Sequence, residues 1–366
     1  MSEPSPSTPD RVDERRQSRH YVALVMAAVS FVALLCVAYL VPVPYVTMRP
    51  GPAFNTLGEI DGTPMFTFAD DVTTYETDGA LDFTTVSVSS PDRSVRIFDA
   101  IAGFVDDDVM VVPRESVYPD GETTDQSREQ GAAQLTSSKD TSRAAALRAA
   151  GYEVTETPQV AGVIDDGAAS GLLEPDDLIL AVDDAPVRAS SDVVEAVGRV
   201  APGDSVVLTI ERGGQEEDVE VVTWPAPDDP DRPLVGITVG TSYDFPIEIE
   251  NNVGDQVGGP SAGIMFALAI YDRLTPDSLT GGQRIAGTGS IDGDGLVGRI
   301  GGIRQKMAGA AADGATIFLV PTDNCAEAAD GSSFGMTLVE VSTLDDAIDA
   351  LETLADDPRA EVPTCR

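Results

Sequence analysis

The pattern of apolar and polar positions divides the chain into segments of different character. Residues 21–40 form one apolar run that contains no charged residue. A helix of about 20 residues rises about 30 Å, which matches the hydrocarbon thickness of a bilayer. The pattern therefore predicts a membrane-spanning helix at 21–41, preceded by a short tail at 1–20.

Basic residues lie mostly on the N-terminal side of this apolar run. Only Arg49 follows it closely, whereas four arginines precede it, namely Arg11, Arg15, Arg16 and Arg19. Because positive charge stays on the cytoplasmic side, we expect residues 1–20 inside the cell and residues 42–366 outside it. A cleaved signal peptide is the alternative interpretation. The length of the run and the lack of a small-x-small cleavage site after it disfavour that alternative.

Two strands are predicted in the region that follows the apolar run. Residues 41–58 are rich in proline and glycine and are predicted to form an extended connector. Alternation of apolar and polar residues at 81–88 predicts a strand, and the short apolar run at 109–112 predicts a second one.

A loop and a helix are predicted next. Residues 120–131 are polar and indicate a loop. Small apolar residues at 141–150 indicate a helix, with Thr141 as its N-cap and Gly151 just past its end.

Short strands and turn residues dominate residues 154–225. The pattern predicts strands at 159–164, 205–211 and 218–223, a helix at 191–199 and a tight turn at 212–214. Residues 226–233 are predicted to be a linker, followed by strands at 234–239 and 246–249. Further on, a hairpin between 289–291 and 296–297 is favoured over a calcium loop, because the downstream glutamate is missing.

Composition limits the classes of function. The chain has 366 residues, of which 42% are hydrophobic, enough for an anchor and about two domains. Its formal net charge of -39 argues against binding to nucleic acid. Cys36 lies in the apolar run, while Cys325 and Cys365 lie on the outer side. These two either form a disulfide that ties the C-terminal tail to the domain or stay unpaired as small buried residues.

Residues 258–268, GGPSAGIMFAL, contain a Gly-x-Ser-x-Gly pattern centred on Ser261. A serine becomes nucleophilic only when a base lies within hydrogen-bond reach. The one histidine, His20, lies at the membrane edge and cannot reach a site on the other side. An α/β-hydrolase triad, which needs a histidine after the serine, is therefore excluded.

Lysine is the remaining candidate base, and the chain has two, Lys139 and Lys306. Arginine is effectively never deprotonated, whereas a buried lysine can lose its proton. Lys139 lies in a polar segment and is predicted to be solvated. Lys306 lies early in a helix of small residues that ends near Gly314. Burial there would have to lower its pKa by about three units, on the order of 4 kcal/mol.

Several short motifs surround Ser261 and Lys306. They are Gly259-Pro260-Ser261-Ala262-Gly263, Thr288-Gly289, and the segment 298–302 that leads to Lys306. With these motifs, residues 234–355 resemble the proteolytic domain of the Lon family of Ser-Lys proteases. Many members of that family carry an acidic residue directly before Gly-Pro. Gly258 stands there in this chain, and Asp255 lies three places further upstream.

This resemblance implies a role for each matched residue. Ser261 attacks the scissile carbonyl, and neutral Lys306 accepts its proton and returns it to the leaving amine. Thr288 hydrogen-bonds the lysine and orients it. Backbone amides around Ser261, where a helix begins, donate to the developing oxyanion.

Residues 154–225 resemble a bacterial PDZ domain. The resemblance rests on Gly167-Ala168-Ala169, Pro175-Asp176-Asp177 and Pro202-Gly203-Asp204, although the family usually has Gly-Asp in place of Asp176-Asp177. It implies capture of an extended protein tail by strand addition. A small β-rich spacer that binds nothing is the alternative.

The order of these parts resembles the membrane-anchored, PDZ-containing Lon-type proteases of Gram-positive bacteria. We expect an α+β fold with a single transmembrane helix, a β-rich PDZ-like domain and an α/β Lon-type domain, followed by a tail at 356–366. The Lon-like fold is expected to begin in the strand at 81–88, which makes 42–153 its first part and the PDZ-like domain an insertion. The resemblance also implies assembly into a homo-oligomeric ring.

The expected activity is a serine endopeptidase that works without ATP. Neither lysine lies in a Gly-x-x-x-x-Gly-Lys-Ser/Thr loop, so proteolysis should need no nucleotide, and no cofactor or metal is predicted. Substrates would be extracytoplasmic proteins with exposed or unfolded segments. The alternative is an anchored PDZ scaffold on an inactive protease fold.

Overall fold

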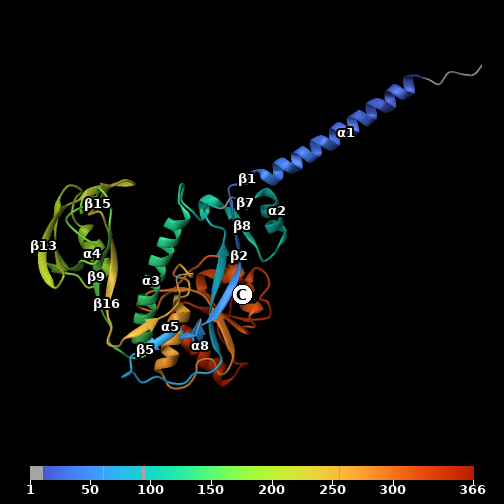
Figure 1. Cartoon of the computed structure of the whole chain (residues 1–366). Coiled ribbons are helices and arrows are strands. Elements are labelled where there is room, and N and C mark those ends of the chain that lie inside the picture. The colour runs from blue at the N-terminus through green and yellow to red at the C-terminus, as the bar shows by residue number, and fades with distance from the viewer. Residues whose placement is uncertain (1–10, 61, 93–94, 255) are drawn as a thin grey trace, which may run out of the picture.

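The computed structural model describes residues 11–60, 62–92, 95–254 and 256–366. A long N-terminal helix, α1 (Arg11–Leu40), projects away from the rest of the chain (Figure 1). Its segment Arg19–Tyr39 is long and apolar enough to cross a bilayer and has no buried residue in its most apolar window. The predicted apolar helix is confirmed, while residues 1–10 of the predicted tail lie outside the described residues.

A six-stranded sheet forms the centre of what we call the main body. Its strand order is β22 (Thr337–Val341), β21 (Ile317–Pro321), β18 (Arg284–Gly287), β6 (Ala80–Val88), β2 (Tyr45–Asn55) and β8 (Met110–Pro113). The first four strands are parallel, and β2 runs antiparallel to both of its neighbours. Strands that precede residue 120 thus share one sheet with strands that follow residue 280. The strands predicted at 81–88 and 109–112 are confirmed with one-residue shifts.

The predicted extended connector at 41–58 is wrong in one respect, because most of it is the sheet strand β2. Proline and glycine interrupt the alternation of apolar and polar residues from which a strand is predicted, so β2 was not recognised. The pairing of β2 with β6 shifts register between Pro50 and Ala53, and such an irregularity accommodates a proline within a strand.

Helices cover both faces of the sheet, because alternate strand residues point to opposite sides. Ile317 and Leu319 of β21 join the core that includes α5 (Gly263–Leu274), α3 (Thr124–Ala149) and α8 (Leu344–Asp356). Phe318 and Val320 join a second core with α6 (Ile303–Ala312) and α7 (Cys325–Ala329). Helix α5 is buried along almost its whole length, which explains why its sequence is apolar on all sides.

Helix α3 corrects the predictions of a polar loop at 120–131 and of a helix that starts at Thr141. The helix begins at Thr124, and Thr123 is its N-cap in a capping box with Gln126. Its first two turns contain no buried residue, so no apolar period marked them. Gly151 follows the helix in the left-handed conformation, as predicted.

A second, smaller unit, which we call the β domain, is built on the sheet order β13 (Gln215–Val222), β12 (Ser205–Arg212), β10 (Leu178–Val182), β9 (Thr155–Val163) and β16 (Ile237–Asp244). Helix α4 (Ser190–Val197) packs on this sheet, and the unit has its own apolar core. The predicted strands, helix and glycine turn of this region are confirmed within a few residues.

The predicted linker at 226–233 and the strand at 234–239 need correction. Residues 224–234 form a hairpin of β14 (Trp224–Ala226) and β15 (Asp229–Leu234), in which Pro225 and Pro233 face each other. A two-stranded hairpin has free edges, where proline is tolerated. The strand that follows, β16, pairs with β9 along its length, so it completes the β domain instead of opening the main body.

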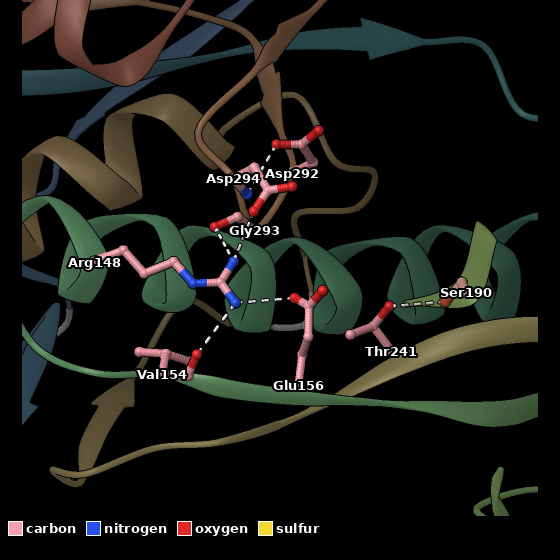
Figure 2. A network of polar contacts seen from close by, with 8 residues as sticks. All are labelled: Arg148, Val154, Glu156, Ser190, Thr241, Asp292, Gly293 and Asp294. Atoms are coloured by element: carbon pink, nitrogen blue, oxygen red, sulfur yellow. Dashed lines mark hydrogen bonds and ion pairs between the residues drawn. The ribbon is translucent and has the colours of Figure 1, made fainter. Parts of the chain in front are cut away.

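Arg148, near the end of α3, ties the β domain to the main body (Figure 2). Its guanidinium donates to the carbonyl of Gly293 at 2.8 Å, to Asp294 at 3.0 Å and to Glu156 of β9 at 2.9 Å. It also donates to the carbonyl of Val154 at 3.2 Å. One side chain therefore joins α3, the first strand of the β domain and the loop of the 289–298 hairpin.

Several short elements complete the fold. They are β1 (Pro42–Val43), β3 (Glu59–Ile60), β4 (Thr63–Pro64), β5 (Phe66–Phe68), β7 (Val95–Arg96), α2 (Ile97–Val105), β11 (Ala185–Pro186), β17 (Ile249–Asn251), β19 (Ser290–Ile291), β20 (Val297–Gly298) and two 3₁₀ turns at Arg114–Ser116 and Thr322–Asn324. The pairing of β19 with β20 confirms the predicted hairpin. Cys325 and Cys365 form a disulfide that holds the C-terminal tail against β22.

Helix α6 lies so close to β2 that a glycine is needed at the contact. A Cβ on Gly309 would lie 2.5 Å from the carbonyl oxygen of Gly51. Gly309→Ala should therefore destabilise the protein, by more than about 1 kcal/mol, although this change usually favours a helix. The matched control is Gly131→Ala in α3, where the added Cβ meets nothing closer than 3.6 Å and should be neutral or stabilising. Urea unfolding of both variants measures the difference, and equal effects would contradict the close contact.

Candidate active site

Ser261 lies on the loop that leads into α5, and α3 holds this loop in place. The backbone N–H of Gly259 donates to the carbonyl of Gly131 at 2.9 Å. Ser138, a buried residue of α3, donates its hydroxyl proton to the carbonyl of Pro260 at 3.1 Å. Gly259 has φ +86°, a left-handed conformation that favours glycine. These contacts fix the backbone directly before the half-buried Ser261.

Lys306 reaches the same loop from the other face of the sheet. Its side chain is buried, with 2% of its surface exposed, and Nζ donates to Oγ1 of Thr288 at 2.9 Å. Thr288 in turn donates to the carbonyl oxygen of Ser261 at 2.9 Å, and the N–H of Gly289 donates to the same oxygen at 2.9 Å. The three residues that the sequence singled out thus form one connected group.

Ser261 and Lys306 also line one cavity of about 470 Å³. Its walls are the end of β6 (Thr84 to Val88) and the loop residues 256–259. A larger hollow of about 1050 Å³ continues from it along α3 and shares Val88 and the same loop. The site therefore opens into a groove long enough for more than one residue of a polypeptide.

Burial determines the electrostatics of Lys306. Removal from water disfavours the charged ammonium and lowers the pKa of Lys306 to about 7. A large share of the molecules would then carry a neutral amine at neutral pH. A neutral amine in the same cavity as a serine is a candidate general base.

The start of α5 offers donors for a developing negative charge. The N–H groups of Gly263 and Ile264 already donate to the carbonyls of Pro260 and Gly289. Those of Ser261 and Ala262 have no backbone partner among the described residues. Free N–H groups where a helix begins are suited to bind an oxyanion.

The loop before α6 sets the position of Lys306. Asn324 is fully buried and makes two hydrogen bonds with the backbone of Ile300, at 2.9 and 3.0 Å. Gly302 then adopts φ +69° and begins the helix. The glycines of the 298–302 motif and the asparagine therefore place the lysine one turn into α6.

The prediction that Lys139 is solvated is wrong. It is half-buried on α3 and donates to the carbonyls of Asn251 at 3.1 Å and Val253 at 3.3 Å. These carbonyls belong to the segment that leads to the Ser261 loop. The supporting role of α3 was missed because its polar first half gave no helical pattern. Asp255, the nearest upstream acidic residue, lies outside the described residues.

Comparison with known families matches two regions of the chain. Residues 254–353 match the profile of the Lon protease (S16) C-terminal proteolytic domain, and residues 134–223 match the profile of the PDZ domain. Both resemblances and the α+β class are thereby confirmed. The chain combines a PDZ domain with a Lon-type proteolytic domain behind one long apolar helix.

Two curated relatives are Lon proteases. The chain is 36% identical over 93 residues to Lon protease of Azospirillum brasilense, covering 25% of this chain and 11% of that protein. It is 31% identical over 120 residues to Lon protease 2 of Bacillus subtilis, covering 33% of this chain and 21% of that protein. The matched regions are thus a small part of these relatives.

Two solved structures are similar to a part of the chain. One is the PDZ domain of the SdrC-like protein from Listeria monocytogenes, with 24% identity over 23% of this chain and 86% of that chain, and a TM-score of 0.21. The other is a protein from Geobacillus thermodenitrificans, with 32% identity over 22% of this chain and 94% of that chain, and a TM-score of 0.21.

Replacing Lys306 should stabilise the protein. A pKa lowered from 10.5 to about 7 means that the folded state holds a neutral amine where the unfolded chain holds an ammonium. This difference in protonation lowers the free energy of unfolding by about 4 kcal/mol at pH 7. The loss disappears as the pH rises from about 7 towards 10.5. Lys306→Met should therefore raise stability by about 1–4 kcal/mol at pH 7 and by much less at pH 10. Urea unfolding at both pH values tests this, and a variant less stable than the wild type at pH 7 would contradict it.

Thr288 is predicted to be a positioning residue for Lys306. Its hydroxyl accepts a hydrogen bond from Nζ, and such a bond stabilises the ammonium more than the amine. Thr288→Val should lower kcat about 10- to 100-fold and move the pH–rate midpoint to lower pH, because the pKa of Lys306 would fall further. Thr288→Ser, which keeps the hydroxyl, is the control and should retain the wild-type midpoint. A loss of rate with an unchanged midpoint would indicate a purely structural role.

Proposed function

We propose that this protein is a membrane-anchored serine endopeptidase with a Ser261–Lys306 dyad that works without ATP. The observation that carries the proposal is a buried lysine with a lowered pKa, linked through Thr288 to the loop of a serine in the same cavity. The match to a Lon-type proteolytic domain over residues 254–353 supports it.

The proposed mechanism follows from this geometry. Neutral Lys306 takes the proton of Ser261 while Oγ attacks the scissile carbonyl carbon, and the carbonyl oxygen becomes an oxyanion held by the N–H groups of Ser261 and Ala262. The tetrahedral intermediate collapses, the C–N bond breaks, and Lys306 gives its proton to the leaving amine. A water molecule, deprotonated by Lys306, then hydrolyses the acyl-enzyme and releases the serine.

The groove suggests an extended polypeptide as substrate. Strand β18 pairs with β6 over Ala80 to Phe83, so the later residues of β6, which line the cavity, extend past this partner. An extended chain could add to this edge by backbone hydrogen bonds. Since no nucleotide-binding loop is present in the sequence, unfolding energy must come from elsewhere, and flexible or unfolded segments are the proposed substrates.

We also propose that the main body carries out catalysis and that the PDZ domain binds the substrate. The main body comprises residues before and after the β domain, as its sheet order supports, so that the PDZ domain is an insertion. Its strand β16 lies at the edge of the sheet, where a protein tail could add as a further strand. With the arginines that precede the apolar run of α1 inside the cell, the substrates are extracytoplasmic proteins.

Replacing either member of the dyad tests the proposed activity. Cleavage of an unfolded protein by the full chain in detergent, without ATP, should fall at least 10³-fold in Ser261→Ala and in Lys306→Met, because each removes a group that the reaction needs. Ser332→Ala, an exposed serine outside the cavity, is the control and should leave activity unchanged. Activity that survives either dyad change would contradict the mechanism. An inactive wild type would favour an anchored PDZ scaffold on an inactive protease fold.

The rate should follow the protonation of Lys306. Below about pH 7 the amine is protonated and cannot accept the serine proton, so kcat/KM should rise about tenfold per pH unit and level off above about pH 7. Measurement of kcat/KM from pH 5 to 9 with a peptide substrate tests this. A profile that still rises tenfold per unit up to pH 9 would show that the base titrates as an ordinary lysine.

A further inference from the structure

Helix α2 turns its small residues inward and its large apolar residues outward. Ala100 and Gly103 are its buried residues. A Cβ on Gly103 would lie 2.6 Å from Val111 of β8, so the helix lies close against that strand. The outer face carries Phe98, Ile101, Phe104 and Val105, which are 41%, 52%, 67% and 80% exposed. A helix that packs on a soluble core has the opposite arrangement, so this face calls for an apolar partner.

The position of α2 identifies that partner. Strand β7, which leads into α2, pairs with β1, the first element after the apolar helix α1. The guanidinium of Arg96, at the start of α2, lies 4.6 Å from the ring centroid of Tyr39 in the last turn of α1. Phe104 packs edge-on against Tyr45, with ring centroids 6.4 Å apart. Figure 1 shows α2 directly beside the end of α1.

We propose that the exposed face of α2 lies in the interface of the bilayer that α1 crosses, so that the main body sits on the membrane. The proposal rests on the proposed anchor and adds a second contact. Tyr39 ends the segment that is apolar enough to span a bilayer, so the membrane surface would lie at the level of Tyr39 and Tyr45. Tyrosines are typical of this level, and both are contacted, Tyr39 by Arg96 directly before α2 and Tyr45 by Phe104 of α2.

The charges around α2 set the depth and the lipid preference. Asp99, Asp106, Asp107 and Asp108 are all exposed at or near the helix, and carboxylates must stay in water. The helix therefore inserts its apolar side chains only to the level of the lipid headgroups. It lacks the basic face with which many interfacial helices bind anionic lipids, so attachment depends on the tether α1 and on apolar contact. Zwitterionic lipids are therefore sufficient for the attachment of α2 to the membrane.

Contact with lipid can be read from a tryptophan placed on this face. The full chain, with its one tryptophan removed by Trp224→Phe, would be reconstituted into phosphatidylcholine vesicles with or without bromine on the acyl chains, which quenches nearby tryptophan. Three variants in this background carry Phe104→Trp on α2, Leu34→Trp in α1, or Val222→Trp on the exposed edge strand of the PDZ domain. Each is compared in the two kinds of vesicle.

The proposal predicts that tryptophan at 104 is quenched at least twofold by brominated lipid, that tryptophan at 34 is quenched more, and that tryptophan at 222 is not quenched. Quenching at 34 without quenching at 104 would overturn the proposal and leave the anchor intact. Emission at 104 that is shifted to the blue but not quenched would show that a second copy of the protein covers the face, which also overturns it. Absence of quenching at both positions would overturn the anchor and the proposal together.

Discussion

The rest of this fold depends on one constraint. The amine of Lys306 is buried, and its hydrogen-bond acceptor is the hydroxyl of Thr288. Nζ of Lys306 meets Thr288, and Thr288 meets the carbonyl of Ser261. Burial that lowers the pKa of the amine also destabilises the folded protein. The surrounding structure has to offset this destabilisation. Gly309 of α6 packs closely on β2, and Asn324 hydrogen-bonds the loop before α6. The stability of the fold and the proposed reactivity are therefore opposed at this one side chain.

The sequence singled out Ser261, Thr288 and Lys306 as members of the proposed site, but it did not reveal the parts that hold them. Ser261, Thr288 and Lys306 could be found because their types and neighbours are unusual: one histidine out of reach, two lysines, and glycine motifs on both sides. The contacts by which α3 holds the Ser261 loop could not be found in this way. Gly131 accepts a hydrogen bond from the N–H of Gly259, and Ser138 and Lys139 donate to backbone carbonyls of distant segments. Such contacts leave no periodic pattern.

The predictions of secondary structure also succeeded in some places and failed in others. The strand with clear alternation, β6, and the end of the small-residue helix α6 were predicted within a few residues. The errors lie where proline, glycine or charge masked the pattern: β2, the hairpin of β14 and β15, and the first half of α3. The membership of β16 in the β domain was hidden for another reason. Pairing with β9 is a long-range choice, and local alternation does not reveal the partner strand.

Contacts between the parts give the molecule its arrangement. Arg148 joins the PDZ domain, α3 and the hairpin loop that follows Thr288, so the proposed substrate-recognition unit is fixed to the body that carries Ser261 (Figure 2). At the other end, the pairing of β1 with β7 connects the apolar helix to the main body through α2. A protein held at both places would present its groove at a defined orientation to the membrane surface.

The most direct test of this account is the titration of Lys306 itself. Because the chain has two lysines, full-length protein labelled with ¹³C at lysine Cε gives two side-chain signals, and the one missing from Lys306→Met belongs to Lys306. Its chemical shift, followed from pH 5 to 11, should change with a midpoint near 7. A midpoint near 10.4, the value of a solvated lysine, would contradict the claim that burial makes this residue the base.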